Sequence, residues 1–217
     1  MITLYGFRGP NVAKTRASLL YKRLEFEQVS VDLIRKSDEF LNLTPIGRIP
    51  LICDEGLIVH DSLFIAEYLD RKYPDAPILL PQSLEERVRA YTIFGLLERM
   101  FTIAAPLVAQ RLGFFTLLDP TAAACSGYYP INAELALNME GQLRGNLISL
   151  FKMLGGPEYF TGQSPTQADF AVFAFLSLLA EIEISAEPLS GWIEQRKLEF
   201  PFNEMFATEE TTFNRSI

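Results

Sequence analysis

The hydropathy pattern of the chain changes near residue 75, and this change constrains the fold more than any other feature. Before it, short apolar runs and helical patterns follow in the order strand, helix, strand, short helix, strand, strand, helix. After Pro74 and Pro81, strand signals nearly vanish and only long helical patterns remain. The sequence predicts an α+β protein with a β-α-β-α-β-β-α domain at residues 1–75, a linker at 76–83 and an all-helical domain at 84–217.

The first half predicts a small mixed sheet. Two strands joined by a helix pair in parallel through a right-handed crossover. Residues 54–56, Asp-Glu-Gly between two apolar runs, predict an antiparallel hairpin. The first helix opens at Pro10, and its apolar positions share one face. We expect Lys14, Arg16, Lys22 and Arg23 to lie largely on the opposite face.

Charge and composition exclude several classes of partner. The 217 residues carry a net charge of −8, with 19 Lys and Arg against 27 Asp and Glu. This balance argues against binding to nucleic acid or to an anionic membrane surface. The net charge does not exclude a small anionic ligand that is bound locally by a few basic side chains.

The sequence contains no motif typical of a metal site, a membrane span or a signal peptide. Cys53, Cys125 and the single His60 do not make a zinc-binding set, and we predict no metal site. The first nine residues lack the basic and apolar regions of a signal peptide, and the longest apolar stretch falls short of the roughly 20 residues of a membrane span. We expect a soluble, cytoplasmic protein with reduced thiols.

Three turns in the first half carry possible chemistry, each with a purely structural alternative. Pro50, in Gly47-Arg48-Ile49-Pro50, opens a strand and is either a cis proline or an ordinary trans proline at a strand edge. Residues 61–62, Asp-Ser, begin a helix after a strand, and they either bind a carboxylate or simply cap the helix. Residues 8–11 join the first strand to the first helix, where a parallel unit presents a ligand crevice or merely turns.

Two features of the second half have a structural interpretation. Thr166 and Asp169 precede an apolar run at the spacing of a capping box, to which we assign no catalysis. Residues 113–129 hold several aromatic side chains without clear periodicity. They form either a hydrophobic binding wall or domain core, because apolar pockets and cores share a composition.

Together these motifs resemble the cytosolic glutathione S-transferase family over nearly the whole chain. The resemblance rests on Leu4-Tyr5-Gly6, on Asn42-Leu43-Thr44-Pro45-Ile46-Gly47-Arg48-Ile49-Pro50, on Asp61-Ser62 with Ala66 and Tyr68-Leu69, and on Thr166, Ala168 and Asp169. It implies a thioredoxin-like first domain and an all-α second domain, which agrees with the pattern of strands and helices.

The resemblance also implies which residues hold glutathione. Ile49, before a cis Pro50, would pair its backbone with the cysteinyl part of the peptide. Ser62 and its helix N-terminus suit the γ-glutamyl carboxylate, and Asp61 suits the γ-glutamyl ammonium. Relatives usually have Glu where this chain has Asp61. Lys36 lies where several classes place a basic residue for the glycyl carboxylate, and Arg48, where Gln is common, adds positive charge.

The chain departs from the family at the group that activates the thiol. Many relatives read Ser-Pro-Asn-Val at the start of the first helix, and this chain reads Gly9-Pro10-Asn11-Val12. Gly9 has no hydroxyl, and no cysteine stands near this turn, which argues against a mixed-disulfide mechanism. Three donors remain, in order of preference the Asn11 amide, the Arg8 guanidinium and the Tyr5 phenol. Each would help a helix N-terminus to lower the thiol pKa from about 8.5.

The expected function is that of a glutathione transferase. Glutathione thiolate would attack a small hydrophobic electrophile bound between the domains, in a homodimeric enzyme. A catalytically weak protein that binds glutathione or a hydrophobic ligand is the first alternative, favoured by Gly9. A glutathione-dependent isomerase or reductive dehalogenase on the same scaffold is the second, because fold alone does not separate these chemistries.

Overall fold

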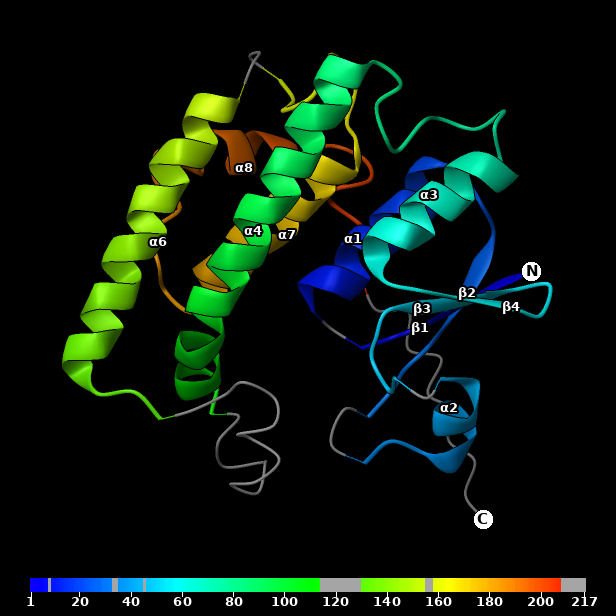
Figure 1. Ribbon diagram of the computed structural model, residues 1–217, viewed down its shortest axis with the longest axis horizontal. Coiled ribbons are helices and arrows are strands. Elements are labelled where there is room, and N and C mark those ends of the chain that lie inside the picture. The colour runs from blue at the N-terminus through cyan, green and yellow to red at the C-terminus, as the bar shows by residue number, and fades with distance from the viewer. Residues whose placement is uncertain (8, 33–34, 45, 114–129, 155–157, 208–217) are drawn as a thin grey trace.

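A four-stranded mixed sheet forms the centre of the first half in the computed structural model (Figure 1), which describes residues 1–7, 9–32, 35–44, 46–113, 130–154 and 158–207. The strands are β1 (Ile2–Tyr5), β2 (Phe26–Val29), β3 (Leu51–Asp54) and β4 (Leu57–His60). Their order in the sheet is β2-β1-β3-β4, with β1 and β2 parallel and the other two pairs antiparallel. The predicted crossover and hairpin are both confirmed.

Helices cover both faces of this sheet. Helices α1 (Pro10–Tyr21) and α3 (Ser62–Lys72) lie on one side, and α2 (Asp38–Leu43) lies on the other (Figure 1). Strand alternation explains the division, since successive side chains point to opposite faces. Leu4 joins the large core shared with α1 and α3, whereas Tyr5 packs with Phe40 of α2. The thioredoxin-like arrangement predicted from the sequence is therefore confirmed.

All the regular elements described in the second half are helices, apart from an isolated bridge between Tyr159 and Gly162. These helices are α4 (Leu84–Arg111), α6 (Ala133–Met153), α7 (Gln167–Glu181) and α8 (Ser190–Arg196). Helix α4 lies along α6 and α7 (Figure 1). It has the length and apolar composition of a membrane span, but it packs here as a core helix of the helical half. Residues 114–129, including most of the aromatic loop, lie outside the described residues.

Local signals place several helix ends where the sequence predicts them. The Ser83 hydroxyl oxygen accepts a bond from the Glu86 N–H, and Thr166 and Asp169 form the predicted capping box of α7. The irregular stretch after residue 198 also contributes to the core. Its Phe202 ring is buried and makes an edge contact with Trp192.

Of the four basic residues predicted to lie opposite the apolar face of α1, Arg23 is exposed but the other three are buried. Lys14, Arg16 and Lys22 are each less than a tenth exposed. The reason is non-local, because their partners are distant in sequence: the Arg16 guanidinium donates to the Gln28 side chain of β2 and to the Glu204 carbonyl oxygen. Lys22 is accommodated by an ion pair with Asp70 and by a bond to the Pro77 carbonyl oxygen.

The segment between the two halves is bound to the first half. Asp70, near the end of α3, accepts bonds from the backbone N–H groups of Leu79 and Leu80, whose side chains are buried. The Leu79 carbonyl oxygen accepts a bond from the Gln167 N–H of α7. The division of the chain at 76–83 stays a prediction.

Candidate functional site

Strand register brings four distant segments to one edge of the sheet. Leu51 at the start of β3 lies opposite both Tyr5, at the end of β1, and His60, at the end of β4. Tyr5 also lies opposite Val29, at the end of β2. The segments after β1, after β2, before β3 and after β4 therefore begin together at this edge. Together with Tyr5 at the end of β1, they contain every residue that the sequence assigned to the site.

The α3 N-terminus is the most clearly built part of this edge. Asp61 caps the helix, and its Oδ1 accepts a 2.9 Å bond from the Leu63 N–H. Asp61 has φ 66°, a left-handed conformation uncommon outside glycine, which turns the chain sharply from β4 into α3. Ser62 is 5% exposed, and within the described ranges its hydroxyl has no bonded partner. The α3 N-terminus therefore has a capping residue, Asp61, next to a residue whose hydroxyl has no described partner, Ser62.

The turn before β3 lies directly beside this helix start. The Ile49–Pro50 peptide bond is cis, which is one of the two alternatives that the sequence left open. Ile49 is half-buried, and no described residue bonds to its backbone N–H or C=O.

Basic side chains lie close to the same turn. Lys36 Nζ lies 3.6 Å from the point where a Cβ on Gly47 would be, so the ammonium covers the loop that leads to the cis proline. Arg48 is exposed on this loop. The two basic side chains predicted to bind a carboxylate are therefore on or against one loop.

The α1 N-terminus has a different character. Gly9 precedes the helix with φ 154°, and no side chain caps the first turn. Asn11 is exposed; its carbonyl oxygen accepts a bond from the Thr15 hydroxyl, while its amide has no hydrogen-bond partner among the residues described. An N-terminus without a cap presents free N–H groups to an anion. Arg8, the second candidate for activation, lies outside the described residues.

Tyr5 is directed to the α2 side of the sheet. Its ring centroid lies 6.3 Å from that of Phe40, and it packs in the small cluster that also touches Ile49. Burial raises the pKa of Tyr5, and the neighbouring Cys53 and Glu27 add to this effect. The phenol stays protonated at neutral pH and keeps a proton to donate.

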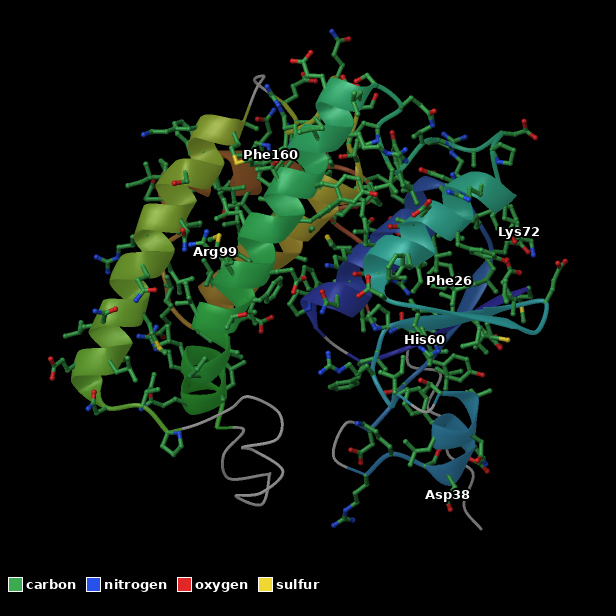
Figure 2. All side chains as sticks on the ribbon, in the orientation of Figure 1. Phe26, Asp38, His60, Lys72, Arg99 and Phe160 are labelled. Carbon is green, nitrogen blue, oxygen red and sulfur yellow. The ribbon has the colours of Figure 1, made fainter. Side chains whose placement is uncertain are left out.

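Three further residues at this edge were not assigned to the site from the sequence. His60, labelled in Figure 2 at the end of β4, approaches the buried Thr44 hydroxyl with Nδ1 at 3.5 Å. Lys14 of α1 is 8% exposed; burial lowers its pKa, and the carboxylates of Glu98 and Asp61 oppose this. Gln167 of α7 donates to the Ser62 carbonyl oxygen. The burial of Gln167 comes from its contact with Ser18 of α1, and no local sequence pattern predicts it.

A small pocket opens beside the start of α1. It is lined by Phe7, Gly9, Val12, Ala13, Arg16, Gln28, Met205, Phe206 and Ala207. Apolar side chains next to Gly9 suit an apolar group near the predicted position of the thiol. Among the described residues, no cluster of three His, Cys, Asp or Glu could hold a metal ion.

Comparison with known proteins identifies the family. The model of the glutathione S-transferase N-terminal domain matches residues 4–77. Glutathione S-transferase Z2 of Arabidopsis thaliana is 34% identical over 159 residues, which cover 63% of this chain and 71% of that protein. The chain belongs to the glutathione S-transferase family.

A plant relative with a shorter match and a solved structure with a lower sequence identity are also similar to this chain. Glutathione S-transferase 1 of Dianthus caryophyllus is 39% identical over 92 residues, so the match spans about two fifths (41%) of either protein. Rice GST1, solved in complex with glutathione, has a TM-score of 0.76 at 23% identity, with 95% of this chain and 90% of that chain covered. The rice structure supports the glutathione S-transferase fold over both halves.

Proposed function

We propose that this glutathione S-transferase binds glutathione at the sheet edge described above and transfers its thiolate to a small hydrophobic electrophile. The observation that carries the proposal is the α3 N-terminus, where Ser62 offers a hydroxyl beside a cis Pro50. A helix N-terminus with a free hydroxyl suits a carboxylate.

The γ-glutamyl end of glutathione is assigned to α3. The Ser62 hydroxyl donates to its carboxylate, and Asp61 receives its ammonium. Asp61 already accepts a bond from Leu63 through Oδ1, which leaves Oδ2 for the ligand. A zwitterionic group is thereby matched by a donor and an acceptor on adjacent residues.

The rest of the peptide follows the loop before β3. Ile49 pairs its N–H and C=O with the cysteinyl backbone, as an added strand does. Lys36 and Arg48 attract the glycyl carboxylate, with long-range attraction that weakens as salt rises. This placement directs the sulfur toward the start of α1.

The thiol is activated at the α1 N-terminus. Asn11 is the first candidate, because its exposed amide has no other partner among the described residues. The helix dipole adds to its effect, since both favour an anion. Arg8 is kept as the second candidate and Tyr5 as the third. The electrophile is then attacked by a positioned thiolate, which accounts for catalysis through proximity and nucleophile activation.

The proposal is tested by binding and turnover together. Calorimetry measures the Kd of glutathione, and a chromogenic aryl halide measures conjugation. We expect wild-type protein to bind and conjugate, and Ser62→Ala to lose affinity. Ser190→Ala, at the start of α8 in the other half, is the matched control. Wild-type protein that does not bind glutathione would contradict the proposal.

An isomerase is the second candidate function. The maleylacetoacetate isomerase of Dictyostelium discoideum is 35% identical over 82 residues, 37% of that protein. Such a reaction uses the same bound thiolate and releases it unchanged. Turnover of an unsaturated diketo acid with no loss of free glutathione would favour it. Glutathione binding without any turnover would favour a silent binding protein. Halide release without a conjugate, accompanied by oxidation of two glutathione molecules to their disulfide, would favour a reductive dehalogenase.

We further propose that the protein is a cytoplasmic homodimer. Four exposed apolar side chains support a second copy as the partner: Phe64 on α3, with Leu84, Val88 and Tyr91 at helical spacing on α4. Phe64→Glu is expected to yield monomers in analytical ultracentrifugation. A wild-type monomer at micromolar concentration would contradict the dimer.

A further inference from the structure

Gln167 occupies an unusual place for a polar side chain. It is 1% exposed and opens α7, the central helix of the second half. The capping of α7 does not need it, because Thr166 and Asp169 form the capping box. A buried amide is costly unless it is hydrogen-bonded, so its partners indicate its role.

Those partners belong to three different segments of the first half and its connection. Its Nε2 donates to the Ser62 carbonyl oxygen at 3.2 Å, and its Oε1 accepts from the Ser18 hydroxyl at 2.5 Å. Its backbone N–H donates to the Leu79 carbonyl oxygen at 2.8 Å. One residue of the helical half therefore joins α3, α1 and the segment between the halves.

The bond to Ser62 bears directly on the candidate site. Ser62 is the first residue of α3, and its hydroxyl and N–H are the groups assigned to the γ-glutamyl carboxylate. The Gln167 amide bonds to the Ser62 carbonyl oxygen and so fixes the orientation of the backbone at the start of α3. The Ser18 hydroxyl, which also lies 2.8 Å from the Lys14 carbonyl oxygen, holds the other end of the amide.

We infer that Gln167 is a positioning residue of the glutathione site, through which the helical half sets the affinity for the γ-glutamyl carboxylate. The inference rests on the proposed function. It makes the α3 anchor dependent on a residue that is 105 positions away in sequence and belongs to the other half of the molecule.

The test uses Gln167→Met, which keeps length and apolar volume but removes both side-chain hydrogen bonds. Glutathione and γ-aminobutyryl-cysteinylglycine, which lacks only the γ-glutamyl carboxylate, are titrated by calorimetry. We expect the variant to bind glutathione about fivefold more weakly, the size of one lost hydrogen bond. Its affinity for the analogue stays at the wild-type value, and kcat is unchanged while KM for glutathione rises.

Tyr21→Leu is the matched control. Tyr21 packs on Phe170 across the same α1–α7 junction, with ring centroids 5.7 Å apart, and has no bond to Ser62. It is expected to lower stability and weaken both ligands equally or not at all. Ser18→Ala removes the second partner of Gln167 and provides a milder variant if Gln167→Met fails to fold; it is expected to cause a smaller loss, again for glutathione only.

Two results would overturn the inference. One is equal weakening of both ligands by Gln167→Met or Ser18→Ala, and the other is unchanged glutathione affinity in a folded variant. Failure of the proposed function looks different, because wild-type protein itself would then not bind glutathione.

Discussion

Two helices begin at the same edge of the sheet, and their N-termini differ in what they offer a ligand. Helix α3 begins with a side-chain cap on Asp61 and with Ser62, a largely buried residue whose hydroxyl has no partner among the described residues. Helix α1 begins after Gly9, and no described side chain caps it. In the proposed function, the anchoring end of the site uses the side chains of Asp61 and Ser62, whereas the activating end relies on backbone N–H groups and on Asn11. Binding and activation can therefore be altered separately.

Helix α7 provides a reference for a helix start with a purely structural role. Asp169 accepts from the Thr166 N–H and hydroxyl and from the Phe160 N–H, and it is fully buried. Every acceptor there is used within the protein. The start of α3 differs, because the Ser62 hydroxyl has no partner among the described residues and would be open to the proposed ligand.

The largest expected effect concerns the α3 anchor. Ser62→Ala removes a hydroxyl that donates to a carboxylate, an interaction of about 1.5–3 kcal/mol. The Kd for glutathione is expected to rise about 10- to 100-fold in calorimetry, with Ser190→Ala at the wild-type value. A Kd within twofold of wild type would remove Ser62 from the site.

The next prediction concerns the start of α1 and the substitution Asn11→Ala. Asn11 is exposed, so unfolding in urea should be unchanged within about 0.5 kcal/mol. Loss of a donor to the thiolate is expected to lower kcat/KM about tenfold while the Kd of glutathione stays constant. If Kd rises with kcat/KM unaffected, Asn11 is an anchor and the separation of roles is wrong.

The pH dependence of stability distinguishes α7 from the two ligand-facing helix starts. Burial raises the pKa of Asp169 to about 6 from an ordinary 3.8, despite the N–H groups that favour its ionised form. Because the folded pKa is the higher one, this contribution to stability is complete below pH 3.8 and is lost as pH rises through 6. Relative to Asp169→Asn, wild-type protein is expected to gain about 1 kcal/mol between pH 7 and pH 5 in urea unfolding. A constant difference would show that Asp169 does not titrate in this range.

The smallest effect concerns the conformation of Gly9. A Cβ there would have space, since the nearest atom is the Phe7 carbonyl oxygen at 4.0 Å, but φ 154° is rarely adopted by other residues. Gly9→Ala and Gly9→Ser are both expected to lose about 1 kcal/mol of stability. Gly95→Ala, in open space within α4, is the control and is expected to gain about as much. Unchanged stability of Gly9→Ser would show that the turn accepts the serine of other relatives.

Local sequence signals were sufficient for the order of the elements. Hydropathy periods and turn residues predicted that order, whereas the grouping of Pro50 with Ser62 was implied by the family resemblance. The contents of the α1–α7 junction could not be predicted in the same way. Gln167 has no local signal, because its side chain is buried against Ser18, 149 residues away in sequence. Lys14 looks like a surface residue on its own helix, and its charged neighbours Glu98 and Asp61 are likewise distant in sequence.

The pKa of the glutathione thiol in the complex tests the central claim most directly. Thiolate absorbance near 240 nm, followed against pH with glutathione bound, gives this value for wild-type protein and for Asn11→Ala. We predict a wild-type value at least one unit below the roughly 8.5 of a free cysteine thiol, with a return toward that value in Asn11→Ala. A bound thiol that titrates at the free value in wild-type protein would contradict activation at α1 and leave only the α3 anchor.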